Sequence, residues 1–202
     1  MIQVRHRSHA TYSRQPRQVR KEATVTGSCV CSGPPVPGYA FAVPSWLRIM
    51  PYDFKNRVRV RLYQLFVESG RCPSIAEVAG ALRCSVSDVS AAFQDLAAAH
   101  MLVLQPGSGE VLMANPLSAV PTPFVVETQA DTGFRSWYGN CIWDALGVIA
   151  MLQNDGRVLT SCGCCGESMS VSVCKGEVET KPPGIVHFAI PAKHWWDDIV
   201  FN

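Results

Sequence analysis

The first candidate for chemistry is a cysteine and an aspartate three residues apart, Cys141 and Asp144. Asp144 is the only Asp, Glu, Lys or Arg between residues 136 and 154, and most of its neighbours are apolar. We expect a helix from Asn140 to Leu152 that is hydrophobic on nearly every face and therefore buried. Burial raises the pKa of a lone carboxyl, so Asp144 would hold and release a proton near neutral pH. Residues i and i+3 share a helix face, which predicts a thiol beside a proton carrier.

The same pair also fits a structural interpretation. In that interpretation Cys141 is a thiol packed in the core and Asp144 is hydrogen-bonded to a nearby amide, because cysteine is often buried for packing alone. The spacing of these residues leaves both interpretations open.

A second sulfur cluster follows at Cys162-Gly163-Cys164-Cys165-Gly166, in a chain with nine cysteines. Cys162 and Cys165 have the C-x-x-C spacing of half a zinc site, and Gly166 suits a tight turn. Structural zinc needs four ligands, and only Cys174 or His187 remain as partners because a second C-x-x-C pair is absent. Capture of a soft metal and a structural role in a turn are the alternatives.

Composition favours a globular protein. The chain has 202 residues, 48% of them hydrophobic, and a formal charge of +2. A charge so near balance argues against a general electrostatic binder of nucleic acid or membranes. Because neither a membrane span nor a secretory signal is recognisable, we expect a soluble, cytoplasmic protein whose cysteines are thiols or metal ligands.

Residues 1–44 are expected to form a flexible tail. They contain six basic side chains before the first acid at Glu22, followed by a Gly- and Pro-rich stretch. An organelle-targeting peptide is the alternative for such an Arg-rich start, although no amphipathic face is evident.

Residues 45–115 have the pattern of a winged helix. Apolar residues recur at helical spacing from Asp53 to Ser69, and two capping boxes, Ser74 with Glu77 and Ser85 with Asp88, begin two further helices. The third helix has the apolar positions Val86, Val89, Phe93 and Leu96. Residues 101–113 then predict a β-hairpin around a Pro-Gly turn.

The third helix is poorly suited to DNA recognition. Between Ser85 and Ala99 it carries no Lys or Arg but two acids, Asp88 and Asp95, which phosphates would repel. A structural or dimerising module is therefore favoured over a nucleic-acid partner.

Residues 116–202 predict a second domain after a Pro-rich linker at 115–123. Val- and Ile-rich stretches predict strands at 124–126, 134–138, 157–161, 168–174, 185–191 and 199–201. Several strands around one buried helix give an α+β fold.

The segment Trp137-Tyr138-Gly139-Asn140-Cys141-Ile142-Trp143-Asp144-Ala145-Leu146 resembles the catalytic segment of the organomercurial lyases, also called alkylmercury lyases. In that family an aromatic pair precedes a Cys-x-x-Asp helix. The stretches 116–123, 186–192 and 195–201 are similar to the family's linker and C-terminal strands, and the winged helix resembles its N-terminal module. The resemblance covers about residues 50–202.

The resemblance implies cleavage of a carbon–mercury bond by protonolysis, giving a hydrocarbon and Hg(II). Thiolates are soft ligands that suit mercury, so Cys141 would bind the metal, while Asp144 would take the thiol proton and return it to carbon. Cys162 resembles a further family cysteine and becomes a second candidate mercury ligand. Trp137, Tyr138 and Trp143 would form an apolar wall for the organic group or simply belong to the core.

The resemblance also implies a substrate, a product and a protein partner. The substrate would be an organomercurial, Hg(II) would be the bound product, no redox cofactor would be needed, and a mercuric reductase would receive the metal.

One departure from the family concerns its second catalytic cysteine, which follows the strand represented by residues 199–201. This sequence ends at Asn202, so we expect a C-terminally truncated member whose activity is impaired. A fragment, a degenerate homologue and a selenocysteine codon are the three explanations. A non-catalytic thiol protein that binds soft metals and a winged-helix regulator are the alternative functions.

Overall fold

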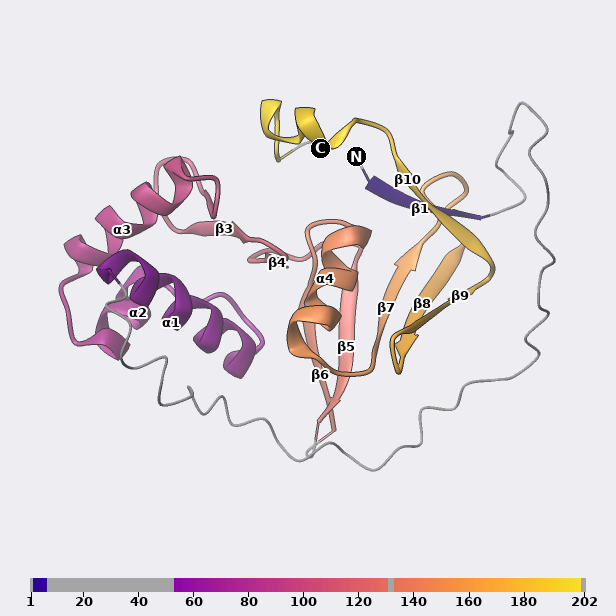
Figure 1. Cartoon of the computed structure of the whole chain (residues 1–202), viewed down its shortest axis with the longest axis horizontal. Coiled ribbons are helices and arrows are strands. Elements are labelled where there is room, and N and C mark those ends of the chain that lie inside the picture. The colour runs from indigo at the N-terminus through magenta and orange to yellow at the C-terminus, as the bar shows by residue number, and fades with distance from the viewer. Residues whose placement is uncertain (1, 7–52, 131–132, 201–202) are drawn as a thin grey trace.

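The structure is a computed structural model that describes residues 2–6, 53–130 and 133–200. Three helices form one unit, and a five-stranded sheet covered by a fourth helix forms the other (Figure 1). Apart from residues 2–6, the expected N-terminal tail lies outside the described residues. None of the helices in the described part of the chain is long and apolar enough to cross a membrane.

The three helices begin where the sequence predicts, and the first one also ends where predicted. They are α1 (Phe54–Ser69), α2 (Ile75–Leu82) and α3 (Val86–Ala98). Both predicted capping boxes are present, and α1 ends at Gly70 with a left-handed φ of 74°. The three helices pack against one another through buried apolar side chains, among them Val58, Leu62, Phe66, Val78, Val89, Phe93 and Leu96.

Val86 departs from the predicted inner face of α3. It is the first residue of the helix and is 53% exposed, whereas Val89 and Phe93 are fully buried. Helical spacing assigns a side chain to a face, but it does not indicate how far along that face the covering elements extend.

A small antiparallel sheet follows, in the order β2 (Val103–Leu104), β3 (Val111–Ala114) and β4 (Leu117–Ser118). The predicted hairpin is therefore present. The segment predicted as a linker contains β4, and Leu117 also forms a bridge to Gly139 in the second unit. The classification of the first unit as a winged helix stays a prediction.

The main sheet is antiparallel throughout, with the order β6-β5-β7-β8-β9. Its strands are β5 (Val125–Ala130), β6 (Gly133–Tyr138), β7 (Gly156–Ser161), β8 (Ser168–Cys174) and β9 (Glu177–Lys181). The mixed α+β class predicted from the sequence is confirmed. The edge strand β9 is missing from the prediction because charged residues alternate along it.

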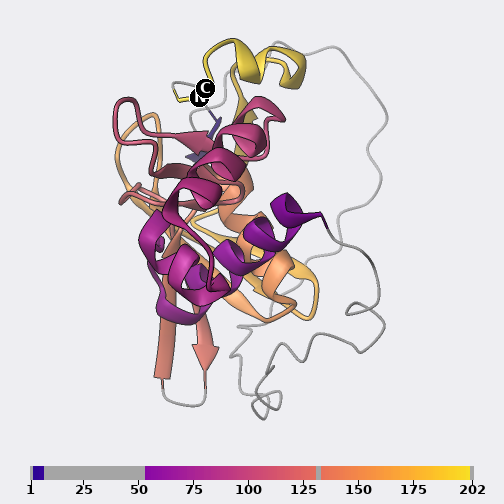
Figure 2. The same ribbon diagram turned by 90° about the vertical axis from the view of Figure 1, so that its left-hand side faces the viewer.

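Helix α4 (Ile142–Leu152) packs on β5 and β7, with β1 at its side. The prediction of burial on nearly every face is wrong. Its sheet-facing residues Ile142, Ala145, Val148 and Ile149 are buried, whereas Trp143 is 55% exposed. The reason is that the sheet covers only one side of the helix, so apolar composition overstates its burial (Figure 1). Seen from the side of α1, α2 and α3, these three helices lie in front of the second unit (Figure 2).

Two terminal segments also differ from the prediction. Residues Ile2–His6 form strand β1, which pairs antiparallel with β10 (Gly184–Phe188) instead of belonging to the tail. After a 3-10 helix at Ala192–Asp197, residues 199 and 200 lie in a turn and not in the predicted strand. Phe201 lies outside the described residues.

Candidate active site

The thiol of Cys141 and the carboxyl of Asp144 meet at the start of α4. Cys141 is the N-cap of the helix and Asp144 is its third residue. The backbone N–H of Asp144 donates to Cys141 Sγ at 3.4 Å, and the thiol donates to Asp144 Oδ2 at 3.5 Å. Both side chains are half-buried. The structure thus brings together the two residues that the sequence singled out, at the helix cap and not within the helix.

Burial dominates the protonation of both groups. It raises the pKa of the Cys141 thiol to about 12, with a further increase from the neighbouring Asp144 charge that backbone N–H groups only partly offset. Burial also raises the pKa of the Asp144 carboxyl, while the side chains of Asn140 and Cys141 lower it. Burial therefore favours the protonated thiol, which forms a hydrogen bond with Asp144 Oδ2.

Asn140, the residue before Cys141, connects this pair to the segment around Asn115. Its Nδ2 donates to Asn115 Oδ1 at 3.0 Å and to the Pro116 carbonyl at 3.4 Å. Its Oδ1 is buried and has no hydrogen-bond partner among the described residues. The side chain that influences Asp144 is thus held by the segment that joins the two units.

The helical unit reaches the same segment through Tyr63 of α1. Its hydroxyl donates to the carbonyl of Asn115 at 2.7 Å. Burial raises the pKa of Tyr63 to about 12, an effect that Arg59 opposes and the charge of Asp144 reinforces. Tyr63 is thus within electrostatic range of the Asp144 carboxyl, and its hydroxyl bonds to Asn115, the residue that holds Asn140.

Close backbone packing fixes the turn before Cys141. A Cβ atom added to Gly139 would lie 2.5 Å from the backbone nitrogen of Ala145, which is in the first turns of α4. Only glycine fits there, so the chain folds tightly back onto the helix that it begins. This turn sets the position of Cys141 relative to the helix.

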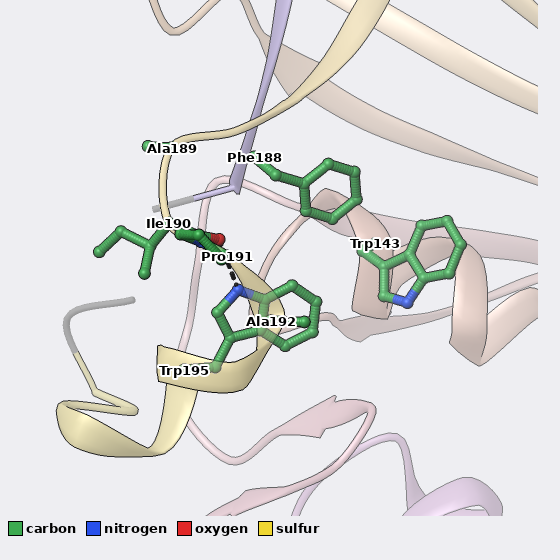
Figure 3. A pocket seen from close by; sticks show the side chains of 7 residues that line it. All are labelled: Trp143, Phe188, Ala189, Ile190, Pro191, Ala192 and Trp195. Atoms are coloured by element: carbon green, nitrogen blue, oxygen red, sulfur yellow. Dashed lines mark hydrogen bonds between the residues drawn. The ribbon is translucent and has the colours of Figure 1, made fainter.

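An aromatic depression of about 410 Å³ borders the exposed side of α4. Figure 3 shows Phe188 with its ring between those of Trp143 and Trp195. The Phe188 centroid lies 5.9 Å from that of each tryptophan, and Trp195 Nε1 donates to the carbonyl of Ile190 at 2.9 Å. Trp137, in contrast, is only 3% exposed and belongs to the core.

Cys162 lies at the same end of the sheet as Cys141. Val125 of β5 pairs with Tyr138 of β6 on one side and with Leu159 of β7 on the other. Cys141 and Cys162 follow those two residues by three positions each. Cys162 is buried, with 2% exposure.

Within residues 2–6, 53–130 and 133–200, no group of three or more His, Cys, Asp or Glu side chains could hold a metal ion. The thiol–carboxyl contacts in this part of the chain include those of Cys141 with Asp144 and of Cys174 with Asp155.

Sequence reasoning missed the supporting residues. Tyr63 and Asn115 are 52 positions apart, and Asn115 and Asn140 are 25 apart, so no local spacing connects them. Phe188 and Trp195 were seen only as parts of C-terminal segments. The one signal in the sequence for an aromatic partner is Trp143, a large aromatic residue between Cys141 and Asp144.

Comparisons with known proteins found one matching family model and a similar solved structure. Residues 117–201 match the family model for MerB, alkylmercury lyase. The crystal structure of the mercury-bound form of MerB2 is similar at 20% sequence identity and a TM-score of 0.50, covering 67% of this chain and 63% of that chain. The latter likeness supports a common fold, and this chain spans 63% of the length of that relative. No curated protein matches. The resemblance to the alkylmercury lyases that the sequence suggests is thus confirmed over residues 117–201, which match the model of that family.

Proposed function

We propose that this chain is an organomercurial lyase that cleaves a carbon–mercury bond by protonolysis. The observation that carries the proposal is the contact between the Cys141 thiol and the Asp144 carboxylate at the start of α4. The family match of residues 117–201 supports the same reaction class.

In the proposed reaction, Cys141 Sγ binds the mercury of the substrate and transfers its proton to Asp144, and the other ligand that mercury carried, acetate or a monothiolate, leaves. Metal binding replaces the proton that burial otherwise holds on sulfur, because a metal-bound thiol is deprotonated. Asp144 then delivers this proton to the carbon atom bonded to mercury. The electron pair of the carbon–mercury bond forms the new carbon–hydrogen bond, so mercury remains Hg(II) and no redox cofactor takes part.

The raised pKa values of Cys141 and Asp144 favour these roles, in which the thiol binds mercury and the carboxyl carries the proton. A carboxyl with a raised pKa is a better proton acceptor than an exposed aspartate, and it gives up the proton more readily than a thiol with a pKa of about 12 does. Asp144 is thus matched to receive a proton from sulfur when mercury arrives and to transfer it onward.

The organic group of the substrate is proposed to lie against the aromatic depression beside Trp143. That residue lies between Cys141 and Asp144 in sequence, and Phe188 and Trp195 extend its apolar surface. Apolar surface of this kind favours a hydrocarbon group over water. A mercuric reductase is the proposed acceptor of the Hg(II) product.

The helical unit is proposed to support the site and not to read DNA. Asp88 caps its own helix and Asp95 forms an ion pair with Lys55, so α3 presents acids to any duplex. Tyr63, by contrast, bonds to the segment that holds Asn140.

The test measures benzene released from phenylmercuric acetate by the full chain. The assay contains a monothiol, which supplies mercury with a second sulfur donor. We expect benzene release above the rate without protein, and about a 10²- to 10⁴-fold loss in Cys141→Ser, because substrate is no longer held beside the acid.

Cys164→Ser is the matched control, since Cys164 is exposed on the β7–β8 loop. This variant should release benzene at the original rate. Metal retention without any benzene would select the non-catalytic alternative, and equal rates in Cys141→Ser and the original chain would reject the proposed role of Cys141.

A further inference from the structure

The loop between β7 and β8 holds three cysteines in a tight, closed turn. The backbone N–H of Cys162 donates to the carbonyl of Glu167, and that of Gly166 donates to the carbonyl of Cys162, both at 2.8 Å. Gly166 adopts a left-handed φ of 74°, which glycine tolerates without strain. The loop is thus closed by hydrogen bonds from both directions at Cys162.

Two of the three thiols interact with each other. Cys162 is buried at the base of the turn, while Cys164 and Cys165 are exposed. The side chains of Cys162 and Cys165 form a hydrogen bond, and Cys165 directly precedes the two residues whose backbone groups bond to Cys162. An inner and an outer thiol therefore lie close enough to share a proton or a ligand.

This arrangement suits a soft ion that accepts two sulfur donors. Thiolates select soft metals, and Hg(II) forms stable complexes with two of them in a linear arrangement. Structural zinc, by comparison, requires four ligands. The described residues supply this loop with a thiol pair, and they form no group of three or more potential ligands that could hold a metal ion.

We propose that Cys162 and Cys165 form a second Hg(II) site, separate from Cys141 and Asp144. Each thiolate donates a lone pair to Hg(II), so two sulfur–mercury bonds form. The two thiol protons go to solvent, and the two ligands that Hg(II) carried, chloride or monothiolate, leave. The oxidation states of sulfur and mercury do not change.

The thiol pair of Cys162 and Cys165 lies at the same end of the sheet as the candidate active site. The strand register puts Cys162 at the same end of the sheet as Cys141. A dithiol there can hold Hg(II) that dissociates from Cys141, because a bis-thiolate complex outcompetes binding by one thiol. Binding at the pair nevertheless does not depend on carbon–mercury cleavage.

The experiment uses the full chain in a Cys141→Ser background, so it does not require lyase activity. HgCl₂ is added, the protein is dialysed against excess glutathione, and bound mercury is measured. We expect the further substitution Cys165→Ser to lower retained mercury by about one equivalent per chain. Cys164→Ser, the neighbouring exposed thiol, should retain as much as the background.

Protection from alkylation identifies the ligands directly. With one equivalent of HgCl₂, we expect iodoacetamide to modify Cys165 about tenfold more slowly, while modification of Cys164 changes little. ZnCl₂ should give no such protection under glutathione. The proposal is overturned if Cys164→Ser lowers retention as much as Cys165→Ser, if neither does, or if Zn(II) protects Cys165 equally well.

Discussion

The protonation of Cys141 is the feature that the proposed chemistry depends on. A cysteine at a helix N-terminus usually has a lowered pKa, because the helix dipole and backbone N–H groups stabilise the thiolate. At this site burial and the charge of Asp144 outweigh those effects and raise the pKa to about 12. The thiol therefore stays protonated until a metal displaces the proton, which makes the proton available to Asp144 only when substrate is bound.

Asn140 sets the acid limit of activity in this account. Because its side chain lowers the pKa of Asp144, Asn140→Ala should raise that pKa. Asp144 accepts the thiol proton only when ionised, so kcat/KM falls as pH decreases through its pKa. We expect the acid limb of the pH profile of benzene release to move to higher pH in Asn140→Ala.

Asn56→Ala, in the first turn of α1, is the control and should leave the acid limb in place. A merely structural role for Asn140 would lower the rate at every pH without moving the limb. An acid limb that shifts to lower pH would contradict the assigned sign.

Local spacing predicted the reactive pair but not its surroundings. Residues three positions apart lie close together at a helix start, so the spacing alone sufficed to predict that Cys141 lies beside Asp144. The contacts of Asn140 with Asn115 and of Asn115 with Tyr63 join distant parts of the chain. They depend on how the two units pack, which no local pattern contains.

At the scale of elements, the turn before α4 is the most constrained backbone near the site. Gly139→Ala would bring a Cβ to 2.5 Å from the Ala145 backbone nitrogen, and neither backbone can move without displacing Cys141. We expect the free energy of unfolding to fall by about 1–3 kcal/mol or more, with activity reduced as well. Urea unfolding followed by circular dichroism measures the change.

Gly80→Ala is the matched control for this substitution. Gly80 lies within α2, and an added Cβ would meet no atom within 4 Å. Alanine in a helix interior is favoured over glycine by about 0.5–1 kcal/mol, so this variant should be slightly more stable. Equal effects at the two glycines would refute the packing argument.

The elements themselves were predictable where capping and periodicity agree. Capping boxes at Ser74 and Ser85 gave the starts of α2 and α3. The edge strand β9 was missed because charged residues alternate along it, and β1 because pairing with β10 is a contact across nearly the whole chain. Residues 199 and 200 have strand-like composition but lie in a turn, since β-branched residues alone do not supply a pairing partner.

At the scale of the whole molecule, the helical unit and the sheet meet beside the site. Tyr63 bonds to Asn115, and a Cβ on Gly70 would lie 3.4 Å from the carbonyl oxygen of Ser136 in β6. Leu117 and Gly139 form a bridge at the same junction. The first unit thus contributes to holding Asn140. A supporting role also fits its helix α3, whose acidic residues disfavour DNA binding.

Stability should decline at alkaline pH because three half-buried groups have raised pKa values. Tyr63, Cys72 and Cys141 each reach about 12, compared with ordinary values of 10.0, 9.0 and 9.0. Between pH 9 and 12 the folded chain keeps protons that the unfolded chain has released, so the free energy of unfolding falls as pH rises. Below that range the stabilisation is fully present.

Urea unfolding at about pH 8 and pH 10 under reducing conditions measures this loss. Cys72→Ser removes one of the three titrations without touching Cys141, so its decrease between the two pH values should be smaller. A chain that becomes more stable over this interval, or a Cys72→Ser variant with an unchanged decrease, would contradict the assigned pKa directions.

The most direct test of the joint action of Cys141 and Asp144 is a single turnover of phenylmercuric acetate followed by intact-mass spectrometry and benzene detection. The original chain and the Asp95→Asn control should retain Hg(II) and release benzene. Asp144→Asn should instead accumulate intact phenylmercury on Cys141, because the thiol binds the metal but no acid protonates the carbon. Benzene release by Asp144→Asn at the original rate, or intact phenylmercury retained by the original chain, would contradict the account.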